Sequence, residues 1–282
     1  MRITSLIITA LALLAAPAMS RAQYIVTDTI APERIVVKGS QFGITLLNNL
    51  DTYLSNYNHT GLGLNYCHEA FRDASTGNSR WKYQRLLNTT LGYAIQGSNL
   101  QYTALISHNW SGYYPFEVAS GLTLLAGAQI QLEGGALYNP SNGNNPAAAK
   151  LRTALAASGM TIYHFPVRHR EWIARYQLDI PLIGAMFAPE FGQSYYEIFG
   201  LGHARNIVAV THPLNNPSWR HTLSLDIPIK ATTLRISYIA DLYQSRINSI
   251  DCHIYRHTFA LGFARTILKI KKENKLNNHS PY

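Results

Sequence analysis

The sequence predicts an all-β fold, an antiparallel transmembrane β-barrel of about twelve strands that follows an N-terminal signal peptide. Three observations predict it. Apolar and polar residues alternate with a period of two along much of the chain, a long stretch carries no charge, and tyrosine occurs 18 times. Successive side chains of a strand point to opposite faces, so each alternating segment has one apolar and one polar face.

The alternation is clearest in three segments of about ten residues, the length of a tilted strand that crosses a bilayer. The even positions of 122–132 and 172–182 are apolar, and so are most odd positions of 219–229. The uncharged stretch runs from Leu86 to Phe116. The tyrosines suit the aromatic girdles that barrels place at both membrane interfaces.

The N-terminus predicts a secretory signal over residues 1–22. Arg2 supplies the basic start, 6–16 form an apolar core too short to span a membrane, and 20–22 form a small-residue cleavage site. Export through the Sec pathway into the outer membrane of a Gram-negative bacterium follows as an expectation. The barrel is expected at 23–268 as a single domain, with a polar basic tail at 269–282.

Twelve strand segments are predicted, and an even number places both termini in the periplasm. The long connections 48–58, 134–149 and 186–195 then all fall on the outer side. Alanine and leucine favour helix, so 147–157 has a short helix as an alternative. The segments are 34–47, 59–71, 80–95, 98–109, 116–133, 150–164, 171–185, 196–203, 206–213, 218–229, 233–243 and 250–268.

The net charge of +9 does not indicate nucleic-acid binding. Two basic residues lie in the signal segment, the tail holds a net +3, and the other bases are mixed with acids on the polar faces. Opposite charges recur at even spacing, as in Arg175 with Asp179, Arg220 with Asp226 and Arg235 with Asp241, which predicts a narrow lumen filled by ionic side chains.

Two cysteines, Cys67 and Cys252, both fall on polar faces by strand parity. An exported protein can oxidise such a pair, but the geometry of a disulfide is demanding and the relative depth of the two residues is open. A free pair is the favoured alternative.

Three loop motifs carry a family resemblance: LDTYLS at 50–55, YNPSNGNNPAAA at 138–149 and FGQSYYEIF at 191–199. With the segments 223–248 and 250–263, they resemble the domain of unknown function 3316 family, uncharacterised bacterial outer-membrane barrels. The resemblance implies the fold and the location, and no activity. Ser141 and Gly143 stand where the family's second motif often has Arg and Ser, so an anion-binding role of that arginine is not expected here.

The topology brings the three motifs to one rim, where a binding surface is expected. The alternative for the second motif is a purely structural role, because Asn-Pro pairs are ordinary turn signals. The rim residues are Asp51, Tyr53, Asn139, Asn144, Asn145, Gln193 and Tyr196.

A second set of residues has the chemistry of an ester hydrolase. Ser194 and Glu197 lie in the third motif, and Asp251, His253 and His257 share one face of the last strand. A nucleophilic serine needs a histidine within hydrogen-bond reach, within a strand or across to a neighbouring one. The same parity leads to Phe259, so the histidines are predicted on the outward face above the apolar band. No metal or cofactor is expected.

Three function hypotheses follow. The first is a surface-exposed structural or binding barrel. The second is a lipid-modifying hydrolase, similar to a lipid A deacylase or a phospholipase, and the third is a small-solute channel. The expected partners are outer-membrane lipid, lipopolysaccharide and the barrel-assembly machinery, with no nucleic acid.

Overall fold

The computed structural model describes residues 34–74, 80–230 and 232–269. The expected signal peptide lies outside the described residues, and so does the expected tail apart from Lys269. Within the described residues, no helix has both the length and the apolar character to cross a membrane.

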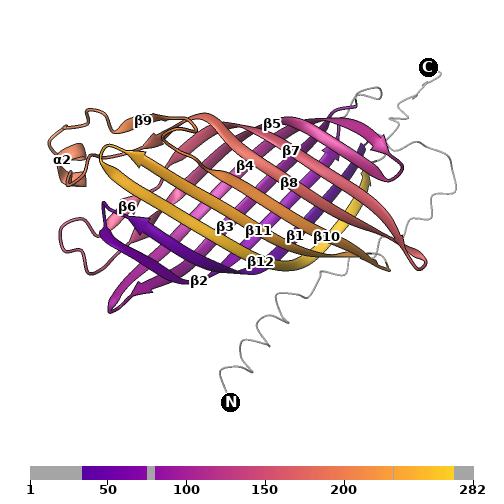
Figure 1. Cartoon of the computed structure of the whole chain (residues 1–282), viewed down its shortest axis with the longest axis horizontal. Coiled ribbons are helices and arrows are strands. Elements are labelled where there is room, and N and C mark those ends of the chain that lie inside the picture. Colours follow the sequence, from indigo (N-terminus) through magenta and orange to yellow (C-terminus); the bar gives the residue numbers. More distant parts are fainter. Residues whose placement is uncertain (1–33, 75–79, 231, 270–282) are drawn as a thin grey trace, which may run out of the picture. The chain divides into compact units, whose positions relative to one another are not determined.

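The described chain consists of antiparallel strands and one short helix (Figure 1). The elements are β1 (Arg34–Asp51), β2 (Ser55–Asp73), β3 (Lys82–Gln96), β4 (Asn99–Ala119), β5 (Leu122–Tyr138), β6 (Ala147–Ala149), β7 (Arg152–Val167), β8 (Arg170–Phe187), α2 (Tyr195–Phe199), β9 (Val208–Thr211), β10 (Trp219–Ile229), β11 (Thr232–Ile247) and β12 (Ile250–Lys269).

The strands form one 12-stranded sheet that closes on itself, which confirms the predicted barrel. Closure comes from β10, which pairs with β11 on one side and with β8 on the other. The ring runs β1-β2-β3-β4-β5-β7-β8-β10-β11-β12 and back to β1. The short strands β6 and β9 pair with the ends of β5 and β8, and so extend the wall at one end.

One predicted strand is wrong. Residues 196–203 do not form a strand, because α2 occupies Tyr195–Phe199 and a turn follows it. Ser194 caps the helix, and its side chain and the Glu197 side chain bond each other's backbone in a capping box. Such a box satisfies free N–H groups of a helix start, which a strand would not need. Residues 147–149 and 152–157 are extended, so the helix alternative for that segment is also wrong.

The two faces of the wall differ as the period of two predicts. On β1, Phe42, Ile44 and Leu46 are 49%, 59% and 50% exposed. Thr45 and Asn49, at odd positions of the same strand, are fully buried. The outward face is therefore apolar and the inward face polar, the pattern of a barrel that contacts lipid.

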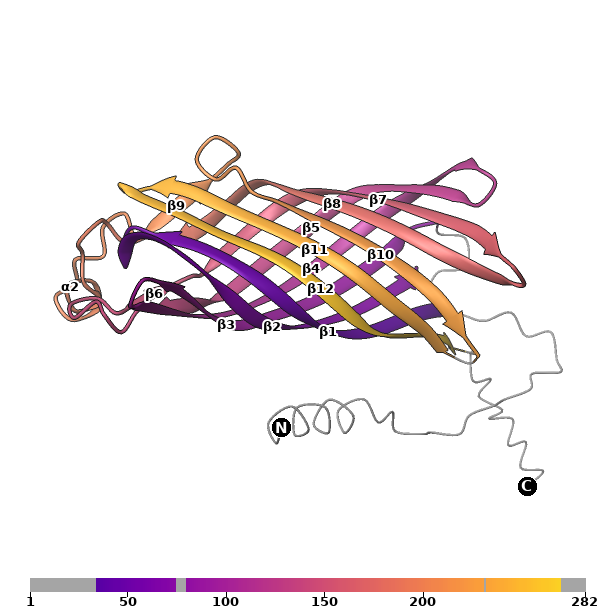
Figure 2. The ribbon, with the colours of Figure 1, turned by 60° about the horizontal axis from the view of Figure 1, so that its bottom comes forward.

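The two ends of the barrel carry different connections (Figures 1 and 2). Strands β4–β5 and β7–β8 join through two-residue turns at the end where β1 begins and β12 finishes. The opposite end, called the rim here, carries residues 52–54, 139–151 and 188–218. All three sequence motifs therefore lie at one rim, as predicted.

Candidate functional site

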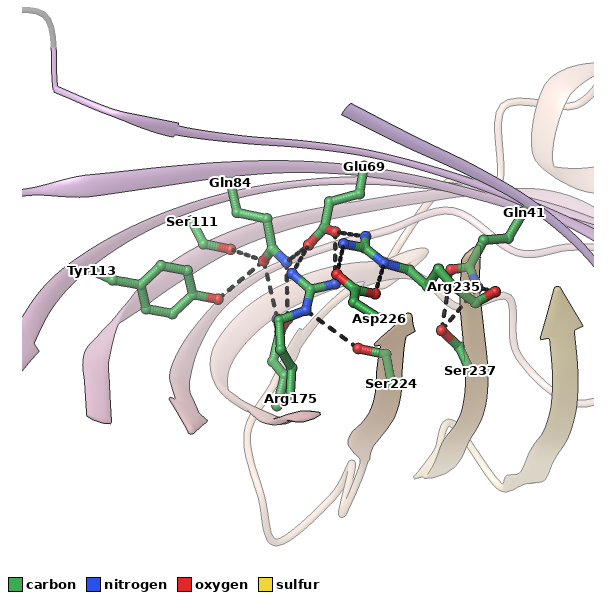
Figure 3. Close-up of polar contacts among 11 residues, drawn as sticks. Gln41, Glu69, Gln84, Ser111, Tyr113, Arg175, Ser224, Asp226, Arg235 and Ser237 are labelled. Carbon is green, nitrogen blue, oxygen red and sulfur yellow. Dashed lines mark hydrogen bonds and ion pairs between the residues drawn. The ribbon is translucent and has the colours of Figure 1, made fainter. Parts of the chain in front are cut away.

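The lumen of the barrel is filled by side chains in layers. Nearest the short-turn end lies the lower charge cluster, which consists of Glu69, Arg175, Asp226 and Arg235 (Figure 3). Arg175 donates from both terminal nitrogens to Glu69, at 3.2 and 2.9 Å, and Arg235 contacts the same carboxylate. Arg235 also donates twice to Asp226, at 2.6 Å in each bond. Paired in this way, buried charges avoid the cost of isolation.

A polar network extends this cluster across the lumen. Gln84 donates to Glu69 at 2.6 Å and to Gln177 at 2.9 Å, and its oxygen accepts from Tyr113 at 3.1 Å. Gln177 in turn donates to Asp179. The network joins β2, β3, β4 and β8, so it fixes one wall of the barrel against the other.

Closer to the rim lies the upper charge cluster, which consists of Glu133, Arg152, Asp241 and Arg256. Glu133 contacts Arg152 at 3.0 Å and Arg256 at 2.7 Å, and Arg256 contacts Asp241 at 2.8 Å. The Arg152 guanidinium also lies 4.3 Å from the centre of the Tyr243 ring. This cluster again neutralises its charges internally.

The charged residues predicted for the lumen do face inward, but their partners differ. Arg175 and Arg235 were expected to be balanced by acids of their own strands, and instead both bind Glu69 of β2. Residues four or six apart in one strand, the spacing of the predicted pairs, are too widely spaced for close pairing, whereas lumen side chains from opposite walls meet. Barrel closure therefore decides the pairing.

The rim end of the lumen is closed by an apolar layer, called the rim cluster here. Its members come from six strands and from the loops between them. They are Tyr53, Leu54, Leu105, Leu137, Ala148, Met186, Ala188, Tyr243, Ile250, Cys252 and Ile254, with Tyr195, Ala209 and Ile247 packed against them. Apolar residues here point into the lumen because loops, not solvent, cover this end.

One ion pair lies beneath the rim loops. Lys150, between β6 and β7, contacts the fully buried Asp51 at 2.6 Å. Burial alone would lower the pKa of Lys150, but the Asp51 carboxylate outweighs burial and raises that pKa. The backbone of Asp51 and Leu54 also closes the β1–β2 turn with a bond of 2.9 Å. Asp51, predicted as a rim binding residue, therefore has an intramolecular partner.

The rim loops bind one another through predicted rim residues. Tyr53 donates its hydroxyl proton to the backbone oxygen of Gln193 at 2.7 Å, and burial raises the pKa of Tyr53 to about 12. The Ala149 backbone N–H donates to the Tyr195 hydroxyl at 2.7 Å. The Gln193 side chain donates to the His203 carbonyl at 2.7 Å. The three motifs thus meet, as predicted, and form a cross-linked lid.

The asparagine-rich loop is held largely by its own side chains. Asn139 accepts from the Ser141 backbone at 3.0 Å, and Asn142 accepts from the backbones of Asn144 and Asn145 at 3.1 and 3.0 Å. Asn142 also donates to the Leu54 carbonyl at 3.0 Å. These are the Asx-type turns that asparagine favours.

The predicted catalytic residues lie in separate places. Ser194 and Glu197 bond each other at 3.0 Å within the α2 capping box, and these bonds from Ser194 lower the pKa of Glu197. His257 pairs with the Tyr238 hydroxyl at 2.8 Å on the outward face, as parity predicted. His253 pairs with Asn48 at 2.9 Å and Asp251 with Arg246 at 3.2 Å. None of these contacts joins the serine to a histidine.

A serine–histidine contact does exist elsewhere on the outward face. Ser40 of β1 and His68 of β2 are direct register partners, and Ser40 Oγ lies 2.9 Å from His68 Nδ1. The Tyr66 hydroxyl lies 3.3 Å from the same oxygen. Sequence reasoning allowed a cross-strand pair but did not find this one, because the register of β1 against β2 is needed to see it.

Both cysteines face the lumen, as parity predicted, and both are free thiols. Cys67 lies opposite Gln41, whereas Cys252 lies opposite Asp51 at the rim. Their different depths explain why no disulfide joins them.

The sequence matches the family described as Protein of unknown function (DUF3316) over residues 6–274. The chain belongs to the DUF3316 family. The match spans nearly the whole chain, so the resemblance drawn from the loop motifs is confirmed. A search of curated proteins finds no match.

Several solved barrels resemble this family member at low identity. The transport unit of the autotransporter AIDA-I from Escherichia coli is 10% identical, with a TM-score of 0.46 over 94% of this chain and 97% of that one. The outer membrane protease OmpT from Escherichia coli is 7% identical, with a TM-score of 0.44 over 86% and 99%. The translocator domain of NalP from Neisseria meningitidis is 9% identical, with a TM-score of 0.38 over 82% and 87%. Such values assign no activity to this chain.

Proposed function

We propose that this DUF3316 protein is a closed, surface-exposed binding barrel of the bacterial outer membrane. The observation that carries the proposal is the filled lumen. Two self-neutralised charge clusters cross it, and the rim cluster closes its outer end. A barrel built in this way offers no continuous path for a solute, which favours a binding role over a channel.

The apolar exterior supports placement in a membrane. Large apolar side chains such as Leu64, Leu91 and Phe259 are 71%, 58% and 60% exposed around the wall. Exposing this much apolar surface to water is unfavourable, whereas lipid accommodates it. Barrels of this kind keep short turns in the periplasm, which directs the rim to the cell exterior.

The rim presents an exposed apolar surface around α2, called the α2 patch here. Phe191, Tyr196, Phe199 and Leu201 are 58%, 71%, 72% and 52% exposed. Phe199 stacks on Phe187 and Tyr195, so the patch is held by the wall beneath it. Exposed apolar patches on otherwise polar loops are typical of interaction sites. The α2 patch is therefore the proposed binding surface.

Cysteine labelling on intact cells tests the orientation. The native thiols are buried, so the wild-type protein provides a low background for a membrane-impermeant maleimide. Tyr196→Cys is expected to react on intact cells. Ser120→Cys, at the exposed β4–β5 turn, is the matched control and should react only after permeabilisation. The opposite labelling pattern would overturn the proposed orientation.

Planar-bilayer recording tests the closed lumen. The purified barrel is expected to show no steady conductance, because both charge clusters and the rim cluster obstruct the lumen. Stable ohmic conductance in the wild-type protein would support the channel hypothesis instead.

A lipid ester hydrolase is the second candidate, favoured by the contact between Ser40 and His68. In that chemistry Ser40 attacks an ester carbonyl while His68 takes the hydroxyl proton. The ester C–O bond breaks, the lysophospholipid alcohol leaves with that proton, and water then hydrolyses the acyl-serine to free the fatty acid and Ser40. His68 has no carboxylate partner within the described residues, which ranks this candidate second. Lysophospholipid that disappears in Ser40→Ala, but not in Ser194→Ala, would establish it.

A further inference from the structure

The lumen holds one arginine whose charge is not matched by an ion pair. Among the described residues, five basic side chains of the lumen pair with acids: Lys150, Arg152, Arg175, Arg235 and Arg256. Arg220 is only 5% exposed, and within the described residues it forms no ion pair. Its Nε and Nη2 atoms are buried without a hydrogen-bond partner. Leaving a buried cation unpaired is costly, which points to a ligand.

The two unpartnered atoms form one edge of the guanidinium. That edge is the fork that binds two oxygens of a phosphate or a carboxylate at once. The register partner of Arg220 is Asp179, which could in principle occupy the fork. Instead, Asp179 accepts hydrogen bonds from Ser158 at 2.5 Å and from Gln177 at 2.9 Å. The free edge of Arg220 therefore remains available.

Arg220 lines a polar cavity between the two charge clusters. Ser107 and Asn109 line the same cavity from β4, and each carries a buried side-chain oxygen without a partner. The acids of the upper charge cluster that reach the cavity, Glu133 and Asp241, are already neutralised by arginines. Unsatisfied polar atoms thus gather on both sides of one space, which is the arrangement of a polar binding site.

The barrel wall is interrupted beside this cavity. Pairing of β10 with β8 stops at Arg220 opposite Asp179, and pairing of β9 with β8 starts at Thr211 opposite Gly184. Residues 180–183 of β8 therefore have no strand partner on this side. Pro181 lies in the gap and contributes no N–H to a ladder. Pro181, Thr211 and Trp219 all line the cavity, so it reaches the wall at this point.

We propose that Arg220 binds an oxyanion of the phosphate class in this cavity, and that the β8–β10 gap is its side entrance. The group comes either from a free phosphate or from the headgroup of an anionic membrane lipid that reaches in from the wall. Both present the paired oxygens that the Arg220 fork requires. The site is independent of the α2 patch, since it lies in the lumen and not on the rim loops.

Titration with inorganic phosphate tests the site in the full-length barrel, purified in a neutral detergent and a phosphate-free buffer. We expect saturable binding, with chloride at equal ionic strength as the reference. Arg220→Gln should weaken binding by about tenfold or more, because two charge-assisted hydrogen bonds are lost. Asp179→Asn should instead strengthen binding, because it removes the negative charge of the register partner of Arg220, which lines the same cavity. Arg246→Gln removes a charge from a residue 84% exposed and should leave binding unchanged.

Native mass spectrometry of barrels extracted from outer membranes distinguishes the two sources. A phosphate-bearing lipid retained by the wild type and lost in Arg220→Gln would identify a headgroup as the ligand. Arg220-dependent phosphate binding without retained lipid would identify a soluble oxyanion. Neither signal, or phosphate binding that is equal in wild type and Arg220→Gln, would overturn the proposal and leave a water-filled cavity.

Discussion

Removing the carboxylate of Glu69 should destabilise the barrel more than any substitution of an exposed acid. Glu69 is 6% exposed and accepts bonds from Arg175, Arg235 and Gln84. In Glu69→Gln one oxygen becomes an amino group that faces these donors. Breaking a buried pair from one side costs about 3–5 kcal/mol, because the remaining charge stays buried without compensation.

The structure divides this cost unequally between the two arginines. Arg235 keeps Asp226, which it contacts through two bonds of 2.6 Å. Among the described residues, Arg175 keeps only the Ser224 hydroxyl, at 3.3 Å. Most of the loss therefore falls on Arg175. The double variant Glu69→Gln with Arg175→Gln should recover part of the loss, with a coupling of about 0.5–3 kcal/mol.

Urea unfolding of the detergent-folded barrel, followed by tryptophan fluorescence, measures these free energies. The matched control is Glu117→Gln, which removes an acid that lies 3.6 Å from Arg80 with both side chains more than half exposed. That control should cost no more than about 1 kcal/mol. If Glu69→Gln costs no more than the control, the lower charge cluster does not stabilise the barrel and the reasoning fails.

Three further predictions concern the thiols and the rim. Cys67 and Cys252 are buried and free, so neither should react with a maleimide until the barrel unfolds. Intact-protein mass spectrometry would measure the labelling, and rapid labelling of the folded protein would contradict their burial. Ser194→Ala should cost α2 about 1 kcal/mol of local stability and speed hydrogen exchange at 195–199 without changing global unfolding. Hydrogen bonds from Ser194 lower the pKa of Glu197 below its ordinary value of 4.5. These bonds therefore stabilise α2 fully above pH 4.5, and their contribution is lost as the pH falls through the lowered pKa. The Ser194 amide resonance should therefore shift below pH 4.5, and a midpoint at or above that value would argue against the capping box. Tyr53→Phe should increase proteolysis of the rim loops, because it removes the bond to Gln193.

The amino-acid sequence alone determined which residues face lipid and which face the lumen. Strand parity is a local property, so it placed Cys67 and Cys252 inward and His253 and His257 outward without knowledge of any pairing. Because consecutive antiparallel strands alternate in direction, the predicted order of strands also placed the three loop motifs at one rim. The helix α2 was missed, although Ser194 and Glu197 already have the capping-box spacing that signals a helix start.

Only the tertiary structure decided which side chains meet. Glu69 pairs with Arg175 and Arg235, separated by more than 100 residues in each case, because closure brings β2 across from β8 and β11. The contact between Ser40 and His68 depends on register, and a slip of one residue would turn one of them inward. The free edge of Arg220 depends on its register partner Asp179, which Ser158 and Gln177 bind instead. Parity is fixed within a strand, whereas register, closure and interruptions are properties of strands packed against one another.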